Sequence, residues 1–126
     1  MKGAFNYTLF MCILLLLIFF GCSNINVATY DVNEYAIINK IITKSELQDC
    51  SKEGITEIYQ DSLELKNYSQ YLPRNEKTKQ MTQNLYIIAE GLYKNSNFNL
   101  NFCKDKLNNL MGTAEDIQKS VGNKPR

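Results

Sequence analysis

Acidic residues and cysteines are the side chains here whose chemistry suits catalysis or metal binding. Two acidic pairs, Asp61 with Glu64 and Glu115 with Asp116, have the residue types needed for acid–base hydrolysis of a glycoside. The sequence has no histidine, so the commonest general base and metal ligand are absent. It also lacks a GxSxG motif and a glycine-rich phosphate loop. Because acidic residues on helices usually face solvent, we predict that the protein is not an enzyme.

The N-terminus has the layout of a secretory signal. Lys2 is followed by an apolar run, Leu9–Phe20, and then by the small residue Gly21 and by Cys22. The run is about 12 residues long, whereas a helix that spans a bilayer needs roughly 20. We therefore favour a cleaved signal over a permanent transmembrane helix, which is the alternative.

The end of this run, Phe19-Phe20-Gly21-Cys22, resembles the lipobox of bacterial lipoproteins. The resemblance implies cleavage between Gly21 and Cys22 and attachment of acyl chains such as palmitate to Cys22. It departs from the family at Phe19, where leucine is usual, and the alternative is that Cys22 is an ordinary thiol. Ser23 resembles the sorting residue that lets such proteins reach the outer membrane. Two or three acyl chains on one residue would make an effectively permanent anchor.

Cys50 and Cys103 are the two cysteines that follow Cys22. Each lies on the apolar stripe of a predicted helix, so we expect both to face one core and to form a disulfide, as a secreted protein permits. The bridge would close a loop of about 53 residues and stabilise the fold by about 4 kcal/mol. Two buried free thiols are the alternative. Two sulfurs without histidine do not make a zinc site, so we expect no metal and no cofactor.

Tyrosines are the main indication of a recognition surface. Tyr68 and Tyr71 lie three residues apart beside the sequence LPRN and form the candidate interaction surface. Tyr59, Tyr86 and Tyr93 add to the number of tyrosines. The alternative is that these side chains form the rim of a small core.

Charge excludes one class of partner. The chain has 14 Lys and Arg against 13 Asp and Glu, and Lys2 is the one charged residue before Cys22. The remainder is formally neutral and has no clustered basic residues, so we expect no nucleic-acid binding.

The chain divides into a signal peptide (1–21), a lipidated cysteine with a polar tether (22–30) and a helical domain (31–126). Ile37, Ile38, Ile41 and Ile42 recur at helical spacing. The sequence Thr43-Lys44-Ser45-Glu46 has the form of a capping box and predicts a new helix there, although the first helix can also continue. The stripe after it consists of Leu47, Cys50, Gly54, Ile58, Leu65, Tyr68 and Leu72.

Gly54 favours a break in that stripe, and Pro73 ends it. A third helix is indicated by Met81, Leu85, Ile88, Ala89 and Leu92, and the Asn-rich sequence 95–102 separates it from the last. The last stripe is the clearest and consists of Cys103, Leu107, Leu110, Ala114, Ile117 and Val121. The sequence thus predicts an all-α, disulfide-linked, up-and-down bundle of three to four helices.

These features together predict a small lipoprotein of the bacterial cell envelope, with the outer membrane favoured. We expect it to bind or block another envelope component, for example in exclusion of phage or plasmid entry. The alternatives are a structural or assembly subunit of a secretion or envelope complex, and a periplasmic enzyme inhibitor. The expected partners are the membrane, through the lipid anchor, and an envelope protein, and no small-molecule substrate is evident.

Overall fold

The computed structural model describes residues 28–95 and 99–126. Within these ranges the chain forms helices α2 (Val32–Glu46), α3 (Lys52–Tyr71), α4 (Glu76–Lys94) and α5 (Leu100–Gly122), and no strand. The prediction of an all-α bundle is therefore confirmed. The predicted signal peptide, its cleavage site, Cys22 and most of the tether lie outside the described residues.

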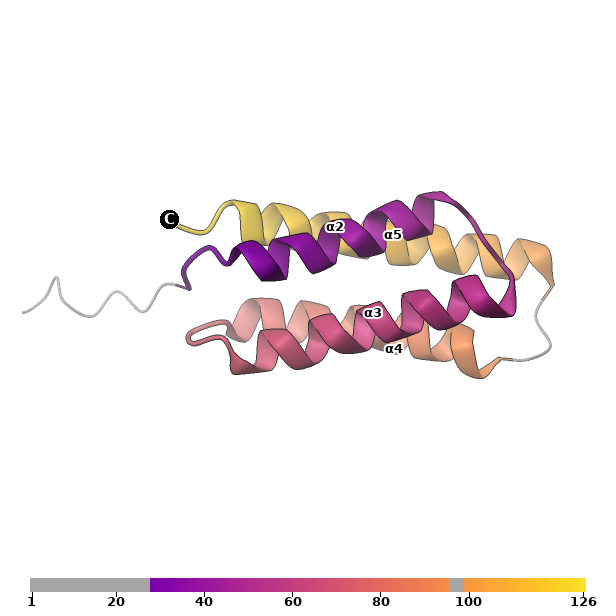
Figure 1. Cartoon of the computed structure of the whole chain (residues 1–126), viewed down its shortest axis with the longest axis horizontal. Coiled ribbons are helices and arrows are strands. Elements are labelled where there is room, and N and C mark those ends of the chain that lie inside the picture. Colours follow the sequence, from indigo (N-terminus) through magenta and orange to yellow (C-terminus); the bar gives the residue numbers. More distant parts are fainter. Residues whose placement is uncertain (1–27, 96–98) are drawn as a thin grey trace, which may run out of the picture.

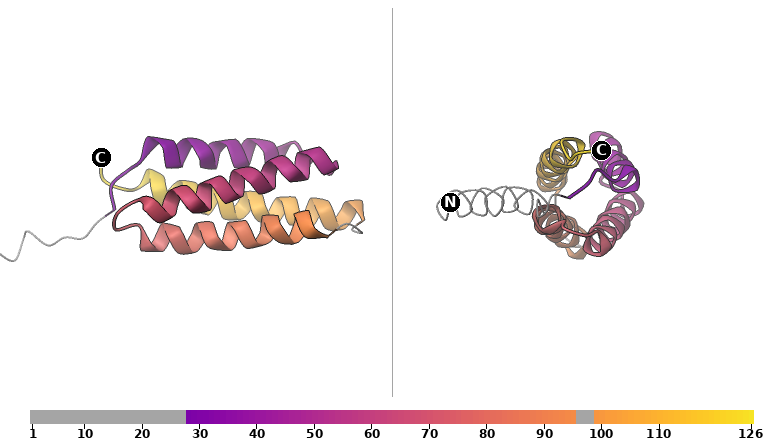
Figure 2. Two further views of the ribbon diagram at one scale, coloured as in Figure 1. Left: turned by 60° about the horizontal axis from the view of Figure 1, so that its bottom comes forward. Right: turned by 90° about the vertical axis from the view of Figure 1, so that its left-hand side faces the viewer.

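The four helices run up and down and enclose a single core (Figure 1). Each packs against its neighbours in the chain, and α5 also packs against α2, which closes the ring seen end-on in Figure 2. The described chain begins and ends at the same end of the bundle, beside the turn between α3 and α4. We call this the terminal end and the opposite one the disulfide end.

The core follows from the spacing of apolar residues. Every residue predicted for the last stripe is buried, because steps of three and four keep one face of α5 toward the other helices. In α2, Ile38 and Ile41 are buried, while Ile37 and Ile42 are half-buried at its edges. The buried apolar residues are Ile38, Ile41, Ile55, Ile58, Leu65, Leu85, Ala89, Leu92, Cys103, Leu107, Leu110, Ala114, Ile117 and Val121.

The connection between α2 and α3 corrects two predictions. No helix starts at the capping box, because α2 continues to Glu46, and the hydroxyl of Ser45 donates to the Ile41 carbonyl inside it. The next helix starts at Lys52, where the Ser51 hydroxyl accepts a hydrogen bond from the Gly54 amide. Leu47 was predicted to be in the core but follows the end of α2 and is 72% exposed.

Gly54 marks the predicted break, but it lies in the first turn of α3 rather than between two helices. The side chain of Asp49 folds back against it, and a Cβ on Gly54 would lie 2.5 Å from the Asp49 carboxyl carbon. A larger residue at position 54 would therefore displace the Asp49 side chain, whose Oδ1 accepts a hydrogen bond from the Ser51 amide.

The predicted disulfide between Cys50 and Cys103 is present, with a distance of 6.1 Å between the two Cα atoms. Cys50 lies in the connection between α2 and α3 rather than on a helix, and Cys103 lies in the first turn of α5. The bridge therefore joins two segments of the disulfide end that are separated by 53 positions in the sequence.

Candidate interaction surface

Tyr68 and Tyr71, the residues selected from the sequence, lie in the last turn of α3 but have different environments. The hydroxyl of Tyr68 donates to the carboxylate of Asp31, at 3.1 Å from Oδ1, and so attaches the end of α3 to the start of α2. Tyr71 is 88% exposed. Tyr68 is thus half-buried and engaged within the fold, whereas Tyr71 is open to solvent, and an interaction surface that contains both stays a prediction.

A larger aromatic surface lies between α3 and α4. The rings of Tyr59 and Tyr93 are stacked, with centroids 4.3 Å apart and an angle of 7° between the planes. Tyr86 lies on the other side of Tyr59, with ring centroids 5.8 Å apart. We call these three residues the aromatic cluster. Tyr86 and Tyr93 meet Tyr59 because they are seven residues apart and so share the flank of α4 that faces α3.

Charged side chains surround the aromatic cluster. The Lys66 ammonium lies 4.1 Å from the centroid of the Tyr86 ring, within range of a cation–π contact. The Tyr86 hydroxyl donates to Glu90 Oε1 at 2.8 Å, and Lys94 forms an ion pair with the same carboxylate at 2.9 Å. The cluster is thus an apolar patch with a polar border, as in the interior and rim of protein interfaces.

These contacts shift two pKa values in opposite directions. The hydroxyl of Tyr59, and then the carboxylate of Glu90, hold the pKa of Tyr86 well above its ordinary value of 10.0. The Lys94 ammonium, and then the Tyr86 hydroxyl, lower the pKa of Glu90. At neutral pH Tyr86 is therefore neutral and Glu90 is ionised.

Part of this surface is exposed. Tyr93 is 44% exposed. Large rigid side chains of this kind contribute most of the binding energy in many interfaces, since they lose little conformational entropy on binding.

The acidic residues considered for catalysis lie in different environments. Asp61 is buried between α2 and α3, where Lys40 lies 2.6 Å from Oδ1 and Lys44 lies 2.8 Å from Oδ2. Glu64 is exposed and 4.0 Å from Lys40. Asp61 therefore acts as the centre of an ion-pair network that joins two helices.

The other acidic pair, Glu115 and Asp116, occupies successive positions on the outer part of α5, with Glu115 half-buried and Asp116 exposed. No group of three or more Cys, Asp or Glu side chains within residues 28–95 and 99–126 is arranged to hold a metal ion. None of the helices in these ranges is long and apolar enough to cross a membrane.

A buried polar network at the terminal end was not predicted. Glu34 has no exposed surface, and its Oε1 accepts hydrogen bonds from Ser69 Oγ and Asn75 Nδ2, each at 2.8 Å. Its Oε2 is 2.8 Å from the Lys124 ammonium, which also donates to the side-chain oxygen of Asn75. The network joins α2, α3, the start of α4 and the C-terminal segment.

The sequence contains a pattern that could have predicted the burial of Glu34 and Asp61. Glu34 precedes Ile38 by four residues and Ile41 by seven, and Asp61 lies between Ile58 and Leu65, so both occupy positions that helical spacing assigns to the core. Because acidic residues are almost never fully buried unless they are paired, an acid at a core position predicts a cationic partner. Which cationic residue this is depends on the packing.

Comparison with known proteins finds no matching family model, no matching curated protein and no matching solved structure. The function must therefore be argued from the residues themselves.

Proposed function

We propose that this protein is a lipid-anchored protein of the bacterial envelope whose helical domain binds, and thereby blocks, another envelope component. The observation that carries the binding role is the aromatic cluster, in which Tyr59, Tyr86 and Tyr93 form a partly exposed patch with a charged border. The anchor is supported by the lipobox-like sequence that ends at Cys22.

The shape of the bundle suits this role. Ala28 lies at the terminal end, so an anchor at Cys22 would hold that end nearest the membrane. The aromatic cluster lies on the long side of the bundle, and Tyr93 is close to the disulfide end. A partner in the same membrane would then meet the side of the domain, at a distance from the headgroups. Exclusion of phage or plasmid entry is the specific form of the proposal, because a small anchored domain blocks a receptor by occupying it.

The anchor is tested by the mass and location of the full chain expressed in a bacterium with two membranes. We expect a mature chain that begins at Cys22 and carries acyl chains, found in the outer membrane. The Cys22→Ser variant should lose the acyl mass and be absent from the outer membrane. An unmodified wild-type chain would contradict the proposal of an anchor.

The blocking role is tested by challenging the same strain with a panel of phages and conjugative plasmids. We expect resistance to at least one element, with loss of resistance in Cys22→Ser and in Tyr93→Ser. Tyr71→Ser is the matched control, since it removes an exposed tyrosine outside the aromatic cluster and should keep resistance. Equal entry of every phage and plasmid into strains with and without the protein would contradict exclusion. In that case, co-purification of a stoichiometric partner with the anchored chain would indicate an assembly subunit.

A further inference from the structure

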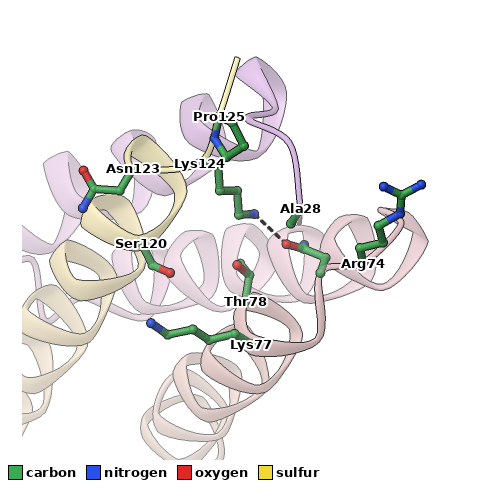
Figure 3. A pocket seen from close by; sticks show the side chains of 9 residues that line it. Ala28, Arg74, Lys77, Thr78, Ser120, Asn123, Lys124 and Pro125 are labelled. Carbon is green, nitrogen blue, oxygen red and sulfur yellow. Dashed lines mark hydrogen bonds between the residues drawn. The ribbon is translucent and has the colours of Figure 1, made fainter. Parts of the chain in front are cut away.

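The terminal end of the bundle contains a hollow that the proposed function does not use. Its volume is about 320 Å³, at the lower end of the range for small-molecule sites. It is bounded by the N-terminal segment at Ala28, the turn from α3 to α4, the first turn of α4 and the end of α5 (Figure 3).

The lining of the hollow is basic. Arg74, Lys77 and Lys124 are among the lining residues, and none of the lining residues is acidic. Lys124 is already engaged by Glu34 and Asn75. Lys77 has no ion-pair partner within the described residues, and its ammonium reaches toward Ser120, while the guanidinium of Arg74 points outward at the edge (Figure 3). Lys77 therefore supplies a positive charge that the fold does not neutralise.

Thr78 is the second feature that indicates a ligand. This residue is only 1% exposed, and its hydroxyl points into the hollow (Figure 3). No described residue forms a hydrogen bond with that hydroxyl. The hydroxyl is not among the fully enclosed polar atoms without a partner, so it remains accessible from the hollow to a group that accepts hydrogen bonds.

The start of α4 adds a third contribution. Asn75 is the N-cap residue, but its side chain does not cap the helix: its oxygen accepts from Lys124, and its amide donates to Glu34 and to the Ser69 carbonyl. The positive end of the helix dipole lies beside Lys77 and Thr78, which is the usual setting for a bound oxyanion.

We propose that this hollow binds a phosphate group, with Lys77 providing the charge and the hydroxyl groups of Thr78 and Ser120 donating hydrogen bonds. The phosphate can belong to a lipid headgroup or to free phosphate. The first source rests on the proposed anchor, because Ala28 is six residues from Cys22 and so lies at most about 20 Å from it. In that case the hollow faces the membrane and the headgroup orients the domain.

The test is titration of the full chain carrying Cys22→Ser, in a phosphate-free neutral detergent, followed by the amide NMR signals of Lys77, Thr78 and Ser120. The probes are inorganic phosphate, short-chain phosphatidylglycerol, and acetate at matched ionic strength. We expect saturable shifts with one or both phosphate compounds and not with acetate. Binding of both probes or of the lipid alone supports a headgroup site, and binding of inorganic phosphate alone supports a site for free phosphate.

The variants Lys77→Gln and Thr78→Val should each weaken binding, by about tenfold for the lost charge. The matched control is Lys104→Gln, which removes the charge of an exposed lysine on α5 at the disulfide end. This variant should bind phosphate with the affinity of the wild type. The absence of saturable shifts, or equal affinity in Lys77→Gln and wild type, would overturn the proposal. Because the titrated chain carries no acyl chains, its result does not depend on whether Cys22 is lipidated.

Discussion

Glu34 is a carboxylate without exposed surface, and its ionic partner, Lys124, lies 90 positions further along the chain. Burial of an ion is unfavourable unless its charge and its hydrogen bonds are satisfied, and here Ser69 and Asn75 complete the set. The stability of the terminal end therefore depends on one residue of α2.

We expect Glu34→Gln to lower the free energy of unfolding by about 3–5 kcal/mol, because it leaves the Lys124 ammonium without its counter-ion in a mostly buried site. Urea unfolding measures the change. The control is Glu46→Gln, which removes the same charge from an exposed position of α2 and should change stability by less than about 0.5 kcal/mol. Equal losses in the two variants would mean that the network is not important for stability.

Tyr86 makes stability sensitive to alkaline pH. Its pKa is raised in the folded protein, first by Tyr59 and then by Glu90, whereas in the unfolded chain the phenol ionises near pH 10.0. The unfolded state therefore loses its proton first, and the stabilisation that is complete below pH 10 declines as the pH rises above it.

We expect the urea midpoint of the wild type to fall more steeply between about pH 9.5 and pH 11 than that of Tyr86→Phe, which has no proton to lose. Lys44 also lowers stability as the pH rises, and it does so equally in both proteins. Burial lowers the pKa of Lys44, but its contacts with Asp61 and Glu57 outweigh this and raise the pKa. Parallel slopes for the two proteins would contradict the assignment to Tyr86.

At the scale of the helices, the start of α3 is set by Ser51 and not by Thr43. Both residues have a hydroxyl and both are followed by an acidic residue within three positions, so local sequence favours neither. Packing decides, because a break at Thr43 would remove the last turn of α2, in which Ser45 is buried and donates to the Ile41 carbonyl.

We expect Ser51→Ala to lower the free energy of unfolding by about 1 kcal/mol, since it removes the acceptor of the Gly54 amide. Thr43→Ala is the matched control: Thr43 is exposed inside α2, where alanine is the better helix former, so stability should stay equal or rise slightly. Thermal unfolding of both variants distinguishes a helix start at Ser51 from one at Thr43. A larger loss of stability in Thr43→Ala than in Ser51→Ala would favour the start at Thr43 that the sequence predicted.

For the whole molecule, the two ends of the described chain hold each other in place. The Tyr30 amide donates to the Pro125 carbonyl at 2.9 Å, Lys124 pairs with Glu34, and the Arg126 guanidinium lies 5.2 Å from the Tyr30 ring. These contacts close the bundle where α2 meets α5, so the last residues are part of the fold.

We expect removal of residues 123–126 to lower the free energy of unfolding by about 3 kcal/mol or more, because Glu34 then remains buried without a cation. Removal of Arg126 alone, the control, should cost about 1 kcal/mol or less, as for an exposed cation–π contact. Hydrogen exchange at the Tyr30 amide should accelerate in the longer deletion. Unchanged exchange there would show that the C-terminal segment does not hold the start of α2.

The sequence by itself determined the all-α class, the apolar face of α5 and the disulfide between Cys50 and Cys103, because helical periodicity is local and the two cysteines after Cys22 permit one pairing with each other. Its predictions failed at Leu47 and at the capping box, where the end of a helix depended on packing rather than on propensity.

Only the tertiary structure decided which polar residues meet. Lys124 reaches Glu34, and Tyr93 stacks on Tyr59, because the rotation of each helix in the bundle brings together side chains that are far apart in the chain. The same holds for Lys77 and Thr78, whose common hollow exists only where α4 begins beside the end of α5. Periodicity identifies the face of a helix that is buried, whereas the partner on that face is set by the packing of the other helices.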